Sequence, residues 1–242
     1  MLAHRGHCKV STEVKKADAH NQGNGGSKKV ENADGSEKTV TANCGGAIYA
    51  AGAEITVAGT TTFKNNTVSN QGGAIYATTH SETVKSETEG VEDTTVVTPT
   101  TLTVSGATFT ENVAGAEGGA IYLTKSTYTV THSTFTNNES KHDVRGGGAI
   151  YSTASEGSMS GVTFTGNHSH KGGAIALHSG STLTVSSMVA KGNYADAYVK
   201  VDEATQTSTS TLGFGGVFYV NNSTLYLKET SEDDEIVLGG SG

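Results

Sequence analysis

The chain has 242 residues, a formal net charge of −8, 32 glycines, one proline and no tryptophan. A nucleic acid partner favours a basic stripe on the protein surface, so the acidic balance argues against nucleic acid binding. The length, the high glycine content and the low aromatic content agree with one elongated, extracellular domain of a structural kind. The charge does not identify a partner.

Residues 1–39 read as a polar N-terminal segment or cap. The first seven residues, Met1 to His7, contain no apolar run that could serve as a signal peptide. The two cysteines of the chain are Cys8 in this segment and Cys44 at the first repeat. An oxidising exterior would permit a disulfide between them. Two unpaired thiols are an equally open alternative.

Two short motifs alternate from residue 40 onward, Gly-Gly-Ala-Ile and Phe-x-x-Asn. Their period is 25 to 29 residues, apart from two longer intervals. A period in this range indicates a stacked repeat architecture. The motif residues are Gly45, Gly46, Ala47, Ile48, Phe63, Asn66, Gly72, Gly73, Ala74, Ile75, Phe109, Asn112, Gly118, Gly119, Ala120, Ile121, Phe135, Asn138, Gly147, Gly148, Ala149, Ile150, Phe164, Asn167, Gly172, Gly173, Ala174 and Ile175.

Short runs with strand character lie between these motifs. Apolar and polar residues alternate in 102–104, 128–130 and 183–185, and this period of two predicts half-buried strands. No window shows convincing helical periodicity. Two or three short strands per repeat, in one orientation, predict an all-β fold, a right-handed parallel β-helix of about six coils.

The two long intervals contain insertions near residues 78–100 and 194–212, which we expect to project as loops. The β-helix is predicted over residues 40–230. Residues 225–227 are its expected last full strand, and residues 231–242 form an acidic, glycine-containing tail.

The motif residues acquire structural roles in such a stack. Equivalent residues of successive coils form ladders, because stacked strands lie about 4.8 Å apart. We expect the Ile and Phe residues to form two interior stacks. The paired glycines would allow positive φ at a tight corner. The Asn would sit near left-handed backbone and bond to nearby amides, which makes the Asn ladder a source of stability.

A tyrosine follows most of the Ile positions and has the opposite parity, so it should face outward. An exposed aromatic stripe can stack on sugars or anchor a protein partner. Such tyrosines can equally stabilise the strands by stacking on one another, or lie beneath the inserted loops. The predicted stripe consists of Tyr49, Tyr76, Tyr122, Tyr151 and Tyr219.

Enzymatic alternatives depend on scattered charged residues. Parallel β-helices also include polysaccharide lyases, which need an Arg base beside a cluster of Asp. Arg145 has only Asp143 nearby. A glycosidase needs two carboxylates flanking the scissile bond. The best candidates, Asp196, Asp202 and Glu203, lie in the second insertion.

Two further binding ideas concern histidine and threonine. The histidines have no Cys or carboxylate that completes a recognisable metal-ligand spacing. We therefore expect no metal and no cofactor, and assign His142, His168, His170 and His178 to surface loops. An outward threonine ladder could match ice, although threonine is also a common exposed strand residue. That ladder would contain Thr56, Thr103, Thr129 and Thr184.

The alternation of the two motifs over residues 40–220 resembles the passenger domain of the chlamydial polymorphic membrane proteins. The resemblance implies an autotransporter passenger that is displayed on the bacterial surface, associated with the outer membrane or secreted, and non-enzymatic. It implies an adhesin toward host cells, with a host-cell surface protein or glycan as partner. The resemblance also implicates the paired motifs in that adhesion. From the parity of the strand residues, we prefer Tyr76, Tyr122 and Tyr151 as contact residues.

The chain departs from a complete member of that family. It shows no transmembrane helix, and the residues after Leu227 are too few for a membrane barrel. We therefore expect a passenger segment without a membrane span, with self-association through the solenoid ends as a further possibility. A polysaccharide-degrading enzyme and a purely structural spacer are the alternative functions.

Overall fold

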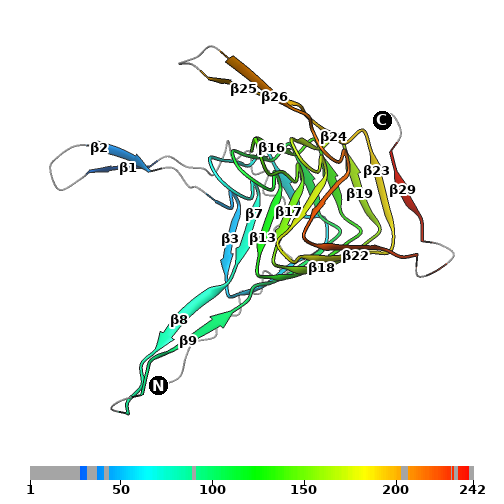
Figure 1. Cartoon of the computed structure of the whole chain (residues 1–242). Helices are drawn as coiled ribbons and strands as arrows, with labels where there is room; N and C mark the ends of the chain where they lie inside the picture. The colour runs from blue at the N-terminus through cyan, green and yellow to red at the C-terminus, as the bar shows by residue number, and fades with distance from the viewer. Residues whose placement is uncertain are drawn as a thin grey trace.

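The computed structural model describes residues 28–31, 37–40, 44–88, 91–202, 207–229, 231 and 234–239. Short strands and turns wind into a stack of six coils (Figure 1). Each of the first five coils contributes four strands to the stack, and the sixth contributes three. The prediction of an all-β parallel β-helix is confirmed, with more strands per coil than expected. The described residues include no helix that could span a membrane.

Equivalent strands of successive coils pair in parallel and form four sheets along the stack. The Ile–Tyr sheet contains β3 (Ile48–Ala51), β7 (Ile75–Thr78), β13 (Ile121–Thr124), β17 (Ile150–Thr153), β21 (Ile175–His178) and β27 (Phe218–Asn221). The hydroxyl sheet contains β4 (Glu54–Val57), β10 (Thr101–Ser105), β14 (Thr127–Thr131), β18 (Glu156–Ser160), β22 (Thr182–Val185) and β28 (Thr224–Leu227).

The Phe-x-x-Asn segment supplies the other two sheets, which is why each coil has an extra strand. The Phe sheet contains β5 (Thr62–Lys64), β11 (Thr108–Thr110), β15 (Thr134–Thr136), β19 (Val162–Thr165), β23 (Met188–Lys191) and β29 (Ile236–Leu238). The short sheet contains β6 (Thr67–Val68), β12 (Val113–Ala114), β16 (Glu139–Ser140), β20 (His168–Ser169) and β24 (Tyr194–Ala195).

The core is a set of ladders inside the stack. Ile121 pairs with Ile75 on one side and with Ile150 on the other, and all three are fully buried. The Phe rings stack with centroids 4.6 to 4.8 Å apart, from Phe63 through Phe164. Burying each such side chain stabilises the fold by roughly 1.5 to 3 kcal/mol. The predicted interior Ile and Phe stacks are therefore confirmed.

The two glycines of each Gly-Gly-Ala-Ile motif have different roles. The first has positive φ, for example 70° at Gly118, as predicted. The second, Gly119, is a point of close approach, because a Cβ there would collide with the carbonyl oxygen of Gly148 in the next coil. Glycine at this position therefore sets how closely successive coils can stack.

The Asn residues form a continuous hydrogen-bonded ladder in the interior. The Nδ2 group of Asn138 donates to the Phe109 carbonyl oxygen (3.0 Å) and to Asn167 Oδ1 (2.8 Å). The backbone N–H of Asn138 donates to the same Oδ1 (2.9 Å). The left-handed residue is the one before the Asn, as at Asn137 with φ of 52°, and not the Asn itself.

A serine ladder, which the sequence analysis missed, closes the corner between the Ile–Tyr sheet and the hydroxyl sheet. The Ser126 backbone N–H donates to Ser155 Oγ (3.0 Å), and the Ser155 N–H donates to Ser181 Oγ (3.3 Å). Ser155 Oγ in turn donates to the Thr153 carbonyl oxygen (2.9 Å). Serine recurs five or six residues after Ile121, Ile150 and Ile175, a spacing that could have revealed this ladder.

Among the described residues, three antiparallel hairpins lie outside the stack (Figure 1). β8 (His80–Val84) pairs with β9 (Thr94–Thr98), and β25 (Tyr198–Asp202) pairs with β26 (Thr207–Thr211), inside the two segments read as insertions. β1 (Lys28–Glu31) pairs with β2 (Glu37–Val40). Val40, expected to open the first coil, therefore belongs to a hairpin.

The sixth coil extends beyond the predicted end of the solenoid. β29 pairs with β23, although its residues fall in the predicted tail. The interior side chains of the sixth coil are more exposed than those of the fifth coil. Val220, Leu227 and Leu238 are 40 to 44% exposed, whereas the residues they pair with in the fifth coil are fully buried.

Candidate functional site

The tyrosines form a column on the outer side of the Ile–Tyr sheet, separate from the interior core. Successive rings from Tyr49 to Tyr151 stack in parallel with centroids 5.1 to 5.3 Å apart. Tyr49 is 62% exposed, but Tyr122 is 7% and Tyr151 only 2% exposed. The tyrosines lie on the outer side of the sheet, as predicted. The expectation that they form an exposed stripe is wrong for Tyr122 and Tyr151.

His178 fills the gap where Ala176 interrupts the tyrosine series. Its ring centroid lies 5.3 Å from that of Tyr151 and 5.4 Å from that of Tyr219. Burial lowers the pKa of the imidazole, and the nearby Arg145 and Lys171 lower it further. The column therefore continues through a neutral histidine to Tyr219.

A buried carboxylate lies beside this column. Glu117 precedes the first glycine of its coil, and its side chain is 3% exposed. Its Oε1 accepts a hydrogen bond from Arg145 Nη1 (3.0 Å), and its Oε2 accepts one from Gln71 Nε2 (2.9 Å). His142 Nε2 lies 3.9 Å from Oε1. These contacts tie the irregular segment 141–145 to the stack next to Tyr122 and Tyr151.

Tyr122→Ala is expected to lower the free energy of unfolding by about 2 to 4 kcal/mol, because a ring stacked on both faces leaves a cavity. Urea unfolding followed by circular dichroism measures this loss. Tyr49→Ala is the matched control, since the exposed Tyr49 is stacked on only one described ring and should lose far less. If Tyr122→Ala is as stable as wild type but binds cells more weakly, the result would instead support the predicted contact stripe.

The tyrosine column should make the fold sensitive to alkaline pH. Burial raises the pKa of Tyr151 to about 12 and the pKa of Tyr122 further still, above the ordinary value near 10. The phenols therefore ionise more readily in the unfolded chain. Stability should stay constant up to about pH 10 and fall as the pH rises toward 12. Thermal melting measured at a series of pH values, together with the absorbance of the phenolate, tests this prediction. Phenolate formation near pH 10 in the folded protein would contradict it.

Three of the four predicted histidines lie at one groove. The assignment to surface loops is wrong for His170, which is buried, and for His178, which lies in β21 and stacks on Tyr151. His142, His168 and His170 line a groove of about 210 Å³ over the short sheet, together with Glu139 and Asp196. His168 Nε2 lies 3.6 Å from Glu139 Oε1, and His170 Nδ1 lies 2.8 Å from the Asp196 carbonyl oxygen. Among the described residues, no group of three or more His, Cys, Asp or Glu side chains could hold a metal ion.

The described side chains of the enzymatic alternative are those of Arg145, Asp143 and Asp196, and the two aspartates both line the histidine groove. Arg145 is held by Glu117, and this hydrogen bond raises the pKa of the guanidinium above its usual value, which disfavours a role as base. Asp143 contacts His142 (3.5 Å). Asp196 lines the histidine groove, whereas the side chain of Asp202 and all of Glu203 lie outside the described residues.

Cys44 occupies the position before the first glycine of its coil, as Gln71 and Glu117 do in the next two coils. Its Sγ lies 3.9 Å from Gln71 Oε1. The hypothesis that Cys44 pairs with Cys8 is not tested, because Cys8 lies outside the described residues.

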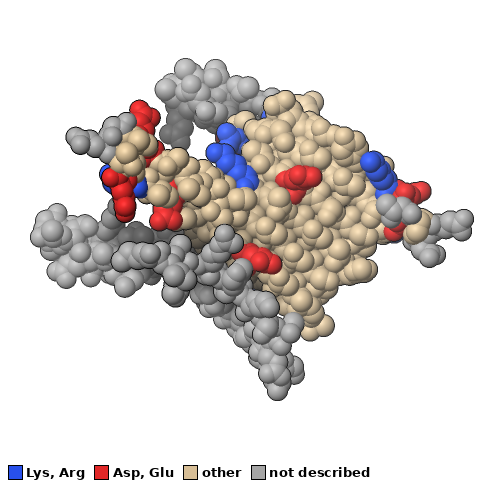
Figure 2. All heavy atoms as spheres, turned by 90° about the horizontal axis from the view of Figure 1, so that it is seen from below, with Lys and Arg blue, Asp and Glu red and all other residues tan. Residues whose placement is uncertain are grey.

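The outer face of the hydroxyl sheet carries few charges, with Glu54 on β4 and Glu156 on β18. Ten of the eleven outward residues of β10, β14, β18 and β22 are Thr or Ser, and the exception is Glu156. The predicted threonine ladder is part of this face, and Ser158 is its member in β18. Figure 2 views the molecule from this side and shows few charged side chains over the stack.

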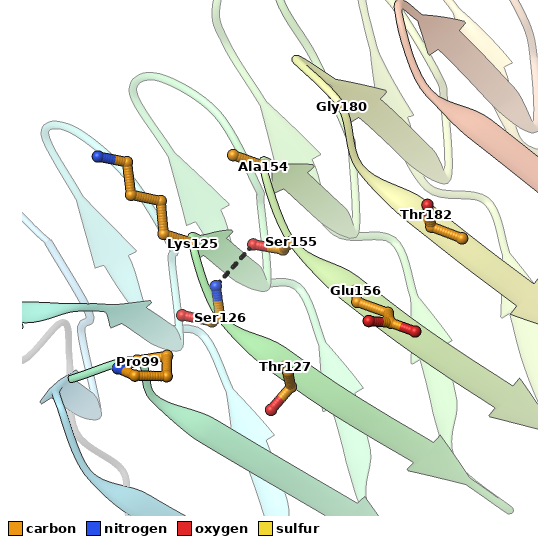
Figure 3. Close-up of a pocket in the computed structure, with 9 residues that line it drawn as sticks. All are labelled: Pro99, Lys125, Ser126, Thr127, Ala154, Ser155, Glu156, Gly180 and Thr182. Atoms are coloured by element: carbon orange, nitrogen blue, oxygen red, sulfur yellow. Dashed lines mark hydrogen bonds between the residues drawn. The ribbon is translucent and has the colours of Figure 1, made fainter. Parts of the chain in front are cut away.

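A groove of about 390 Å³ follows the corner at the edge of this face. Thr127, Glu156 and Thr182 line one side from three neighbouring strands, as Figure 3 shows. The corner residues on the other side include Lys125 and Ala154, both with positive φ. The groove therefore crosses successive coils and runs along the stack.

These ladders define the protein as a β-solenoid built from one repeated unit. Four segments match the model of the Chlamydia polymorphic membrane protein repeat, at residues 60–78, 106–124, 132–153 and 161–177. Each segment runs from a strand of the Phe sheet to a strand of the Ile–Tyr sheet in the next coil. The repeats that build this stack are therefore those of the Chlamydia polymorphic membrane protein family. No curated protein and no solved structure matches the chain.

Proposed function

We propose that the chain is a passenger segment of a bacterial autotransporter, displayed at the cell surface, and that it acts as a non-enzymatic adhesin. The supporting observation is that the four matched repeats are consecutive steps of one continuous stack. A rigid rod of this kind holds binding surfaces away from the membrane and repeats them along its length.

The first projecting hairpin is one candidate contact element. Every residue of β8 and β9 is exposed, including the apolar Val84, Val96 and Val97. The two strands pair only with each other among the described strands, so their outer edges present backbone groups to a partner. A receptor could therefore add a strand to this hairpin.

The family motifs contribute to adhesion indirectly in this proposal. Their Ile, Phe and Asn side chains are buried in the matched coils, so they cannot contact a receptor while the stack is folded. Their role is to hold the outer surfaces in register. Self-association through the solenoid ends stays a prediction.

Binding of labelled protein to cultured epithelial cells tests the proposal, with circular dichroism confirming the β structure first. We expect saturable binding that unlabelled protein competes away. A variant in which a short glycine turn replaces residues 79–99 tests the hairpin. A well-folded chain that fails to bind any host cell would favour the structural spacer, and hydrolysis of a polysaccharide would favour the enzyme.

A further inference from the structure

We propose that the outer face of the hydroxyl sheet and the adjoining corner groove bind an extended, uncharged glycan chain lying along the stack. This inference rests on the proposed adhesin function, and it assigns the ligand class and the surface. The sheet face and the groove are one continuous site, because Thr127, Glu156 and Thr182 belong to both.

The chemistry of the face matches that of a neutral sugar polymer. Each Thr or Ser hydroxyl both donates and accepts hydrogen bonds, as sugar hydroxyls do. Some of these hydroxyls already associate across coils, with Oγ1 of Thr101 3.2 Å from that of Thr127, and Thr129 Oγ1 3.3 Å from Ser158 Oγ. A row of preordered hydroxyls can therefore exchange water for sugar.

The geometry of the face favours a linear polymer. Rows of outward hydroxyls repeat with the spacing of stacked strands, about 4.8 Å. An extended β-linked glycan advances by about the same distance per sugar, so one sugar can face each coil. The β-branched threonines are stiff, which limits the entropy lost on binding.

An aromatic side chain ends the central hydroxyl row. Tyr226 pairs with Thr184 in the register of the sheet and is 44% exposed. Lys228 Nζ lies 4.7 Å from the ring centroid of Tyr226. An exposed Tyr combines an apolar face with a polar tip, so it can stack on the apolar face of a sugar ring.

Other linear partners fit this face less well. A peptide that binds by strand addition needs a free sheet edge, whereas β10, β14, β18 and β22 each pair on both sides. A sulfated or nucleic acid chain needs clustered cations. The groove offers the single cation Lys125, together with the carboxylate of Glu156, and Lys228 lies apart from it beside Tyr226.

The test is surface plasmon resonance of the full chain over immobilised chitohexaose, cellohexaose and heparin. We expect binding to at least one neutral oligomer and less to heparin. The double variant Thr129→Val with Thr184→Val should bind that oligomer about tenfold more weakly, because it loses two hydroxyls but keeps β-branched side chains. Tyr226→Ala should also weaken binding.

The matched control is Thr136→Val with Thr165→Val on the Phe sheet, which should bind like wild type. Melting curves confirm that the variants fold. Binding to heparin alone, no binding to either neutral oligomer, or equal loss in the control pair would overturn the glycan site. Cell binding that survives both enzymatic removal of surface glycans and the pair Thr129→Val with Thr184→Val would overturn the site's role in adhesion, while leaving the adhesin proposal intact. Binding to a neutral oligomer without binding to cells would support the glycan site and contradict the adhesin proposal.

Discussion

Replacing Asn138 with alanine is expected to lower the free energy of unfolding by about 3 to 6 kcal/mol, since a buried group left without its hydrogen bond costs roughly 1 to 3 kcal/mol. The substitution removes one hydrogen bond from each of four groups: the backbone N–H and Nδ2 of Asn112, the Phe109 carbonyl oxygen and Asn167 Oδ1. Asn112 Nδ2 keeps its bond to the Phe63 carbonyl oxygen, and Asn167 Oδ1 keeps the Asn138 backbone N–H. Asn138 is fully buried, so water cannot replace these contacts. Chemical unfolding followed by circular dichroism measures the loss.

Two companion variants separate the hydrogen bonds from other effects. Asn137→Gly changes the exposed neighbour, whose φ of 52° suits glycine, and should leave stability nearly unchanged. Asn138→Asp keeps the size of the side chain but replaces the Nδ2 donor by an oxygen. That oxygen would face the Phe109 carbonyl oxygen and Asn167 Oδ1, so the variant should be destabilised at least as much as Asn138→Ala. An aspartate variant as stable as wild type would rule out the ladder as a source of stability.

The fold was predictable from the sequence because a solenoid ladder uses the same residue type at the same place in each coil. The Ile, Phe and Asn ladders therefore appear in the sequence as a regular repeat, and the insertions are recognised as departures from that repeat. β29 was missed for the converse reason. Its residues, 236–238, complete the sixth coil without either family motif.

The surfaces were harder to predict, because what covers an outward side chain does not repeat. Parity gave the direction of the Tyr column correctly. It could not show that Glu117 and Arg145, which occur in one repeat each, lie beside Tyr122 and Tyr151. The threonine row was visible in the sequence, but the corner groove was not. The groove depends on the backbone path at Lys125 and Ala154, where non-glycine residues take positive φ.

Gly119→Ala is expected to destabilise the fold by at least about 3 kcal/mol, the upper range for a side chain forced into a packed interior. Its Cβ would collide with the Gly148 carbonyl oxygen and lie 2.6 Å from the backbone carbonyl of Glu139. Both obstacles are backbone atoms of the next coil, so no side-chain rotation relieves them. The coils must separate locally, which breaks parallel strand pairing on both sides of the corner.

Gly180→Ala is the control that isolates this steric cause. Gly180 has φ of 82° and no atom within 4 Å of an added Cβ, so alanine there should cost only the roughly 1 to 2 kcal/mol of left-handed backbone. Thermal melting of the two variants side by side tests the difference, and equal losses would mean that coil spacing does not explain the second glycine. If Gly119→Ala also loses cell binding, the Gly-Gly-Ala-Ile motif supports adhesion through the spacing of its coils, and its buried residues need not contact the receptor. Gly180 lines the corner groove, so this control is compared by stability alone.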